Sequence, residues 1–323
     1  MARPDRVSVV AAVLGVALAV GAGIGLGLLG GGPAQSPPVA EPPGTASLTP
    51  TVPAPADPRS TTPAPPSPTA TGSAPAAPSS IPAGPPDNGA TPAPAWLGSR
   101  LLPTDSTGHA AAAATPPELV VRRIVTVDVL PPPADGRFHS TVSAVSAAIA
   151  ARSSWEPGCP VPIGELRYLT VSFRGFDGRA HTGELLVHRT VATGIVRVFE
   201  QLFAIDFPIE RMTVTSRVEL DARPTGDGNN TSAYVCRTIR GQTTWSEHAY
   251  GRAIDVNPFL NPYLKGEIVL PELATAYADR GRDVPGMILP GGPVVTAFRD
   301  AGLRWGGDFQ SLKDYQHFST TGR

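Results

Sequence analysis

The chain carries SEHAYGRAID at residues 246–255 and DYQHF at residues 314–318. The end of the first stretch is predicted to be a short strand, on which Ile254 and Val256 share one face and Asp255 lies on the other. A carboxylate between two apolar neighbours on a central strand needs a partner, because burying a lone charge is costly. A bound cation would meet that need.

Two histidines and one aspartate form a candidate set of metal ligands: His248, Asp255 and His317. Gly251 lets the chain turn between the first two, and the third lies on another element. A catalytic zinc ion typically takes three protein ligands, for which imidazole nitrogen and carboxylate oxygen are both suitable, and keeps a fourth position for water. Asp314 is placed to take a proton from such water and pass it to a leaving amine.

Each of these residues also has a structural interpretation. A lone histidine on a strand is usually a structural side chain, Asp255 could pair with Arg252 or Arg304, and Asp314 could cap a turn. The presence of both spaced motifs, H-x6-D and D-x-x-H, weakens this interpretation. The chain has no H-E-x-x-H, so the helical zinc-binding arrangement is excluded.

The surrounding sequence mixes strand and helix patterns without regular βαβ repeats. The expected elements are a hairpin of strands at 166–173 and 183–188, an amphipathic helix at 190–204 capped by Thr190 or Thr193, strands at 211–218 and 252–256, a helix at 294–301 and a last strand at 315–319. This order predicts an α+β fold, with a small antiparallel sheet and flanking helices.

Composition divides the chain into three parts. Arg3 and Arg6 precede an uncharged apolar run, which is typical of an export signal and is also long enough to span a bilayer. The middle part is rich in Pro, Ala, Ser and Thr and has too few apolar side chains to order itself. The expected parts are a signal peptide or membrane anchor at 1–32, a disordered linker at 33–114 and a folded domain at 115–323.

Charge and cysteine content narrow the class of protein. The net charge is −1, whereas a nucleic-acid-binding domain usually shows a clear basic excess. We therefore expect no nucleic-acid partner. A peptide or a neutral polymer is the expected partner. Cys159 and Cys236 are predicted to form a disulfide, as a lone pair in an exported protein often does. Two buried free thiols are the alternative.

The pattern S-x-H-x-x-G-x-A-x-D at 246–255, followed by D-x-x-H at 314–317, resembles the M15 family of zinc D-Ala-D-Ala carboxypeptidases and peptidoglycan endopeptidases. The resemblance covers residues 155–323. NNTSAY at 229–234 and WGGD at 305–308 are similar to a bacterial branch of that family. The family implies a hedgehog/DD-peptidase-like fold, Zn2+ on the three candidate ligands His248, Asp255 and His317, and Asp314 as the catalytic acid and base.

The family also has a substrate-binding arginine upstream, in a context like S-G-Y-R. SAYVCR at 232–237 is similar with insertions, so Arg237 is expected to polarise the scissile carbonyl or hold a substrate carboxylate. Arg217 is the alternative. Carboxypeptidase members commonly have Glu where Asp314 stands, and Asp is more like the endopeptidase branch that cuts L-Ala–D-Glu. The tryptophan of WGGD could wall a peptide cleft, or stand in the core beside a tight turn.

These observations together predict an extracytoplasmic hydrolase, either membrane-anchored or secreted into the cell wall. It would be a zinc metallopeptidase that acts on peptidoglycan stem peptides, as a D,D-carboxypeptidase or an L-Ala–D-Glu endopeptidase. A non-catalytic zinc-containing wall-binding module and an inert structural anchor are the alternatives. The sequence leaves the bond that is cut, the oligomeric state and any regulator open.

Overall fold

The structure, a computed structural model, describes residues 89–106 and 109–322. These residues all belong to one unit of the chain, Ala76–Arg323. The predicted signal or anchor at 1–32 and most of the predicted linker lie outside the described residues. Within the described part, no helix is both long enough and apolar enough to cross a membrane.

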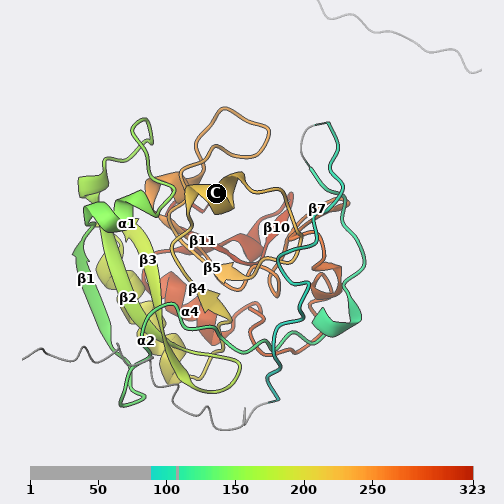
Figure 1. Cartoon of the computed structure of the whole chain (residues 1–323), viewed down its shortest axis with the longest axis horizontal. Coiled ribbons are helices and arrows are strands. Elements are labelled where there is room, and N and C mark those ends of the chain that lie inside the picture. The colour runs from blue at the N-terminus through green and yellow to red at the C-terminus, as the bar shows by residue number, and fades with distance from the viewer. Residues whose placement is uncertain (1–88, 107–108, 323) are drawn as a thin grey trace, which may run out of the picture. The chain divides into compact units, whose positions relative to one another are not determined.

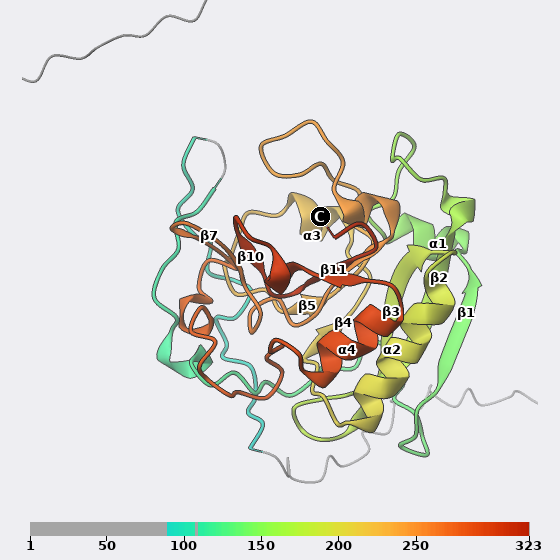
Figure 2. The ribbon, with the colours of Figure 1, turned by 180° about the vertical axis from the view of Figure 1, so that it is seen from behind.

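Short strands and helices are interspersed along the described chain (Figure 1, Figure 2). The strands are β1 (Ser140–Ala144), β2 (Leu166–Arg174), β3 (Ala180–His188), β4 (Arg211–Met212), β5 (Asn230–Thr231), β6 (Ala253–Asp255), β7 (Tyr263–Lys265), β8 (Ile268–Leu270), β9 (Arg304–Trp305), β10 (Lys313–Asp314) and β11 (His317–Ser319). The α-helices are α1 (Ala147–Ala151), α2 (Ala192–Ala204), α3 (Arg217–Asp221) and α4 (Pro293–Asp300). The 3-10 helices are η1 (Pro117–Leu119), η2 (Ile163–Glu165), η3 (Glu247–Tyr250), η4 (Thr275–Tyr277) and η5 (Gly306–Asp308).

The two longest strands, β2 and β3, form the predicted hairpin. They pair antiparallel along their full length, and β1 pairs with the other edge of β2. Helix α2 packs against β2 (Figure 2), because apolar residues at strand spacing meet apolar residues at helical spacing. The buried residues of this layer include Leu169, Val171, Leu185, Val187, Ile195, Val198, Phe199 and Leu202.

Helix α2 begins two residues later than expected, at Ala192. Its N-cap is Val191, which makes no side-chain capping hydrogen bond, so the predicted cap by Thr190 or Thr193 is wrong. The hydroxyl of Thr190 instead lies 2.7 Å from Nδ1 of His188, at the end of β3. The helix is held by its buried apolar face and not by its cap.

The predicted strand at 211–218 is correct only at its start, where β4 forms. Ser216 then caps helix α3: its hydroxyl accepts a hydrogen bond from the amide of Glu219, and the Glu219 carboxylate returns to the Ser216 amide. This capping box satisfies two amides at the helix start. The local capping interaction therefore prevails over the β-branched composition of the stretch.

Three smaller sheets complete the described part. Sheets β6-β11-β9 and β10-β7-β8 are antiparallel, whereas β4 and β5 pair in parallel. Helix α4 supports the first of them, because the ring of Phe298 stacks on that of Phe318 with the centroids 3.9 Å apart. Small antiparallel sheets with few helices agree with the predicted α+β class, although several sheets replace the single one that was expected.

Part of the stretch predicted to be a linker is built into the fold. Ala90 is buried in an apolar cluster with Leu119 and Phe259, and Thr91 forms a bridge with Ile124. The chain that follows this stretch is also tied to the core. The guanidinium of Arg122, which is 1% exposed, donates hydrogen bonds of 2.7 and 2.6 Å to the carboxylate of Glu210.

Candidate metal centre

A tight 3-10 turn, η3, presents His248 to the interior. The Ser246 hydroxyl caps the turn by accepting a hydrogen bond from the His248 amide. Gly251 ends it with a φ of 65°, and a Cβ on this residue would lie only 2.7 Å from the backbone nitrogen of His188. Both the positive φ and the close approach require glycine at this position. The turn leaves His248 3% exposed.

Asp255 and His317 reach the same place from two neighbouring strands. They are direct partners in the antiparallel pair of β6 and β11, and residues opposite one another project from the same face of a sheet. Ile254 and Val256 face the other way and are 1% and 0% exposed in the core. The alternation predicted from the sequence is confirmed, and it turns Asp255 toward His317.

The three candidate ligand atoms form a small triangle. His248 Nε2 is 3.2 Å from both His317 Nδ1 and Asp255 Oδ1, and the last two atoms are 3.0 Å apart. Tetrahedral coordination with bonds of about 2.0–2.1 Å places ligand atoms roughly 3.3 Å apart. One cation could therefore satisfy all three atoms, which hydrogen bonds around a triangle cannot do with good angles. Within the described residues, this is the group of His, Cys, Asp or Glu side chains that could hold a metal ion.

A hydrogen bond on the side of the ring away from the triangle orients His248 for metal binding. Its Nδ1 lies 2.6 Å from the carbonyl oxygen of Ala233, so Nδ1 carries the proton and Nε2 keeps its lone pair toward the triangle. Although burial raises the pKa of the Asp255 carboxyl, the imidazoles of His248 and His317 lower it well below its usual range. Asp255 is therefore a carboxylate ready to bind a cation.

Asp314 lies beside this triangle with one oxygen withheld from solvent. Its Oδ1 is buried and has no hydrogen-bond partner among the described residues. Burial is the main cause that raises the pKa of Asp314 to about 6, while the neighbouring His317 lowers it and the charge of Asp255 raises it. Asp314 is thus close enough to the candidate ligands for their charges to affect its pKa, and its Oδ1 is not engaged in a structural hydrogen bond.

The turn after β9 fixes the backbone of Asp314. A Cβ on Gly306 would lie 2.5 Å from the carbonyl oxygen of Asp314, so the close approach requires glycine. The indole of Trp305 donates a 2.8 Å hydrogen bond to the carbonyl oxygen of Tyr315. Trp305 is 2% exposed in the core, so WGGD forms a tight turn beside a core tryptophan and does not wall a cleft.

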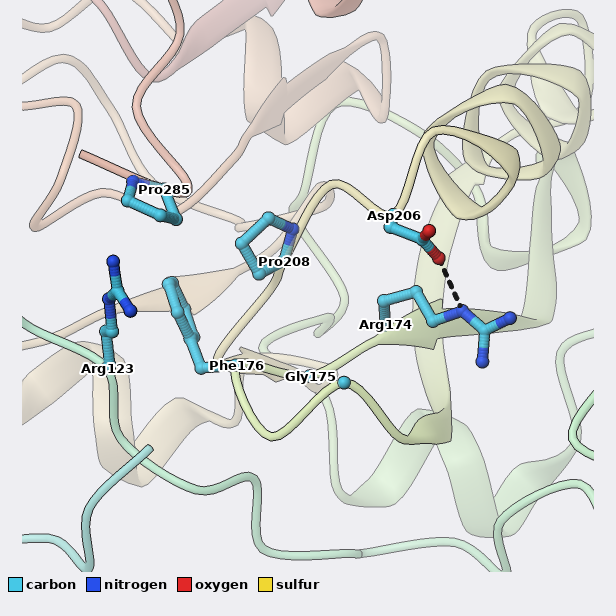
Figure 3. A pocket seen from close by; sticks show the side chains of 8 residues that line it. Arg123, Arg174, Gly175, Phe176, Asp206, Pro208 and Pro285 are labelled. Atoms are coloured by element: carbon cyan, nitrogen blue, oxygen red, sulfur yellow. Dashed lines mark ion pairs between the residues drawn. The ribbon is translucent and has the colours of Figure 1, made fainter. Parts of the chain in front are cut away.

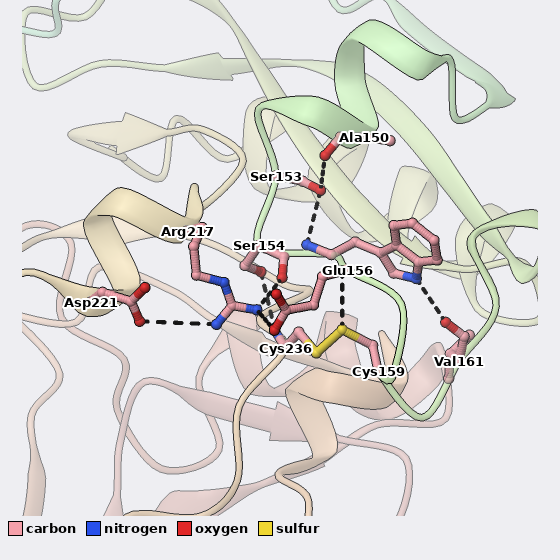
Figure 4. The surroundings of a disulfide bond; sticks show 10 residues. Ala150, Ser153, Ser154, Glu156, Cys159, Val161, Arg217, Asp221 and Cys236 are labelled. Carbon is pink, nitrogen blue, oxygen red and sulfur yellow. Dashed lines mark hydrogen bonds and ion pairs between the residues drawn. A yellow bond between two sulfur atoms is a disulfide. The ribbon is translucent and has the colours of Figure 1, made fainter.

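Arg237 and Arg217 have different surroundings. Neighbouring protein atoms lower the pKa of the Arg237 guanidinium, and the charges of Asp255 and Asp314 raise it. Arg237 is nevertheless exposed, so its side chain remains accessible to solvent. Arg217 is instead held by Glu156, 2.6 Å away, and lies near the disulfide (Figure 4). Arg237 therefore lies within range of the charges of Asp255 and Asp314, whereas Arg217 is held by Glu156.

Cys159 and Cys236 form the predicted disulfide (Figure 4). The bond connects the loop after α1 to the segment just before Arg237. That segment includes Ala233, whose carbonyl oxygen contacts His248. The amide of Cys236 also donates a 3.1 Å hydrogen bond to the hydroxyl of Ser154. The disulfide thus anchors a segment that contacts the candidate metal centre.

Replacing both cysteines by alanine is expected to lower the free energy of unfolding by about 2–5 kcal/mol, because the bond closes a loop with a sequence separation of 77 residues. Urea denaturation of the two proteins measures this difference. A reducing agent should lower the midpoint of the wild type and leave that of the double variant unchanged. Equal midpoints for the two oxidised proteins would contradict the prediction.

The raised pKa of Asp314 predicts a pH-dependent stability for the metal-free protein. Its folded-state pKa of about 6 lies above the unfolded value, so its contribution is fully present below about pH 4 and is lost as the pH rises through 6. Asp314→Asn should therefore stabilise the metal-free protein at pH 8, by up to about 2–3 kcal/mol, and have little effect at pH 4. Urea midpoints of the chelated proteins at both pH values test this, and a less stable variant at pH 8 would refute it.

A separate hollow of about 600 Å³ lies elsewhere on the described part (Figure 3). Its lining includes Arg123, Phe176 and the ion pair between Arg174 and Asp206, whose Nε–Oδ1 distance is 3.1 Å. None of the candidate ligands, nor Asp314 or Arg237, lines this hollow. The hollow and the triangle are therefore separate features of the described part.

Two features next to the triangle were missed in the sequence. The carbonyl of Ala233 orients His248, but a backbone acceptor leaves no side-chain signal. Tyr263 stands directly opposite Asp314 in the pair of β7 and β10. Its signal would have been the motif N-P-Y at 261–263, which has the character of a turn followed by a strand.

Comparison with protein families gives a match to part of the chain. Residues 240–320 match the M15 peptidase model described as D-alanyl-D-alanine carboxypeptidase. This range includes His248, Asp255, Asp314 and His317, and it excludes Arg237. No curated protein and no solved structure matches the chain. The part of the chain that holds the triangle is thus similar to the M15 peptidases, a family of hydrolases, which confirms the resemblance found in its sequence.

Proposed function

We propose that this protein is a zinc-dependent peptidase that hydrolyses amide bonds in peptidoglycan stem peptides. The observation that carries the proposal is the triangle of His248, Asp255 and His317, with the unpartnered Oδ1 of Asp314 beside it. The family match supports a peptidase, and the donor set of two imidazoles and one carboxylate supports zinc.

His248, Asp255 and His317 would hold the ion, which when bound supplies Lewis acidity toward water and toward a carbonyl oxygen. The hydrogen bond from His248 to Ala233 keeps the ring in the tautomer that this requires. Because Asp255 and His317 are cross-strand partners, their positions follow from the pairing of β6 with β11.

Asp314 would move the proton in the reaction. Its buried Oδ1 accepts a proton from the attacking water and then passes it to the nitrogen of the leaving amine. A carboxyl whose pKa is raised toward neutrality is suited to both steps, since it must be charged in the first and protonated before the second. A cation in the triangle would lower this pKa through its positive charge.

Arg237 would contribute at the carbonyl side of the scissile bond. Its guanidinium is accessible and lies within the electrostatic reach of Asp255 and Asp314. A guanidinium can donate two parallel hydrogen bonds to a substrate carboxylate, or stabilise the negative charge that develops on a carbonyl oxygen. Aspartate at position 314 favours the endopeptidase that cuts L-Ala–D-Glu over the D,D-carboxypeptidase.

The disulfide and the family match are consistent with an extracytoplasmic protein that meets peptidoglycan outside the membrane. A long linker rich in Pro and Ala ahead of the domain would let it reach into the wall, whether the apolar N-terminal segment is retained as an anchor or removed as a signal.

Digestion of purified muropeptides, followed by mass spectrometry, tests the proposed function. Loss of a terminal D-Ala would identify a carboxypeptidase, and a new amino group on D-Glu would identify the endopeptidase. Zinc content is measured on the same sample. A protein that carries one zinc ion, binds the wall and releases no amine would instead be the non-catalytic wall-binding module.

A further inference from the structure

A tyrosine stands beside Asp314 in the structure. Tyr263 begins β7 and lies directly opposite Asp314 in the antiparallel pair of β7 and β10. Residues that are directly opposite project from the same face of the pair, with their Cβ atoms about 4.5–5.5 Å apart. The phenol ring of Tyr263 and the carboxylate of Asp314 therefore share one face.

No hydrogen bond within the described residues explains why a tyrosine hydroxyl stands at this position. Tyr263 is half-buried, and its hydroxyl makes no hydrogen bond to any described residue. Other tyrosine hydroxyls serve the fold: Tyr168 donates to the Glu184 carboxylate at 2.7 Å, and Tyr277 donates to the Leu119 carbonyl at 3.1 Å. An accessible donor next to Asp314 is thus available to a ligand.

The surroundings keep this hydroxyl protonated. Burial and then the negative charge of Asp314 raise the pKa of Tyr263 above its usual value. The effect of the Asp314 charge agrees with the strand register, which places the two side chains on one face. A phenol in this state donates a hydrogen bond at neutral pH and carries no charge of its own.

We propose that Tyr263 contacts the substrate, with its hydroxyl donating a hydrogen bond to an oxygen of the first residue on the leaving-group side of the scissile amide. This inference rests on the proposed function, in which Asp314 passes a proton to the leaving nitrogen. A donor beside Asp314 lies beside that nitrogen, and the nearest acceptor on the leaving residue is the oxygen on its own C1 carbon. A peptide carbonyl and a terminal carboxylate both place an oxygen there.

The test compares wild type and Tyr263→Phe on two peptides. The first is the shortest stem peptide that the wild type cleaves, and the second is its analogue in which the leaving residue is replaced by ethylamine, which has no C1 oxygen. Removing the hydroxyl should lower kcat/KM about 5- to 10-fold for the first peptide and less than about 2-fold for the second. Zinc content and the urea midpoint should stay at wild-type values.

Tyr168→Phe is the matched control, because it removes the same atom from a tyrosine that is bonded to Glu184 on the hairpin sheet. Its kcat/KM should equal that of the wild type for both peptides. Unchanged kinetics in Tyr263→Phe would overturn the inference, and so would an equal loss for the two peptides, since the hydroxyl would then act on the centre and not on the leaving residue. A wild type that cleaves no stem peptide would remove the proposed function itself, which is a separate outcome.

Discussion

Asp314→Asn should lower kcat for stem-peptide hydrolysis by about 10²- to 10⁴-fold while the zinc content stays at one per chain. The amide keeps the size of the carboxyl group, but it can neither accept the proton of water nor deliver one to the leaving nitrogen. Since Asp314 is not one of the three triangle atoms, the ion should remain bound. KM should change little, because the loss falls on the proton transfers and not on ground-state binding.

Asp300→Asn is the control for this variant. Asp300 is an exposed aspartate at the end of α4, where it is paired with Arg299, and its loss should leave kcat unchanged. Zinc content and kcat are measured on the same preparations of both variants. A fully active Asp314→Asn that still contains zinc would remove Asp314 from the mechanism.

Removing a triangle residue should have a still larger effect. His317→Ala is expected to lose stoichiometric zinc on dialysis and to lower kcat/KM by at least about 10⁴-fold, because the remaining imidazole and carboxylate cannot hold a tetrahedral site with an open position. Exhaustive chelation of the wild type should produce the same loss, and adding zinc should restore the activity of the wild type but not that of the variant.

The stability of the protein should follow the metal. An ion that binds only the folded state stabilises it by about 4 kcal/mol when its concentration is 1,000 times its dissociation constant. The wild type should therefore unfold at lower urea concentration after chelation, whereas His317→Ala should respond to neither chelator nor zinc. His139→Ala is the control, because His139 is exposed and paired with Asp135, away from the triangle. Full hydrolysis by the chelated wild type would contradict the metal assignment.

The sequence predicted correctly those elements whose pattern of apolar and polar residues lies within one short stretch. The β2–β3 hairpin formed where alternation and the turn sequence agreed, and α2 formed over its apolar face. The stretch at 211–218 was misread, because its β-branched residues suggested a strand while Ser216 and Glu219 form a capping box. A cap depends on two specific side chains, and composition averaged over a window conceals it.

The candidate ligands could be named from the sequence because their chemistry is in their side chains. A histidine and an aspartate on either side of a glycine turn, with a second histidine on a later strand, already indicate a divalent ion. Alternation also placed Asp255 on the opposite face from Ile254, as the structure confirms. The sequence by itself thus determined the residue types of the candidate centre and the face on which the carboxylate lies.

Only the tertiary structure decided how these residues meet. The contact between His317 and Asp255, 62 residues apart, depends on the register of β11 against β6, and a shift of one residue would turn His317 to the other face. The carbonyl of Ala233 that orients His248, and the position of Tyr263 opposite Asp314, have the same origin. Strand register and backbone acceptors arise from the pairing of distant segments, and no local sequence pattern encodes that pairing.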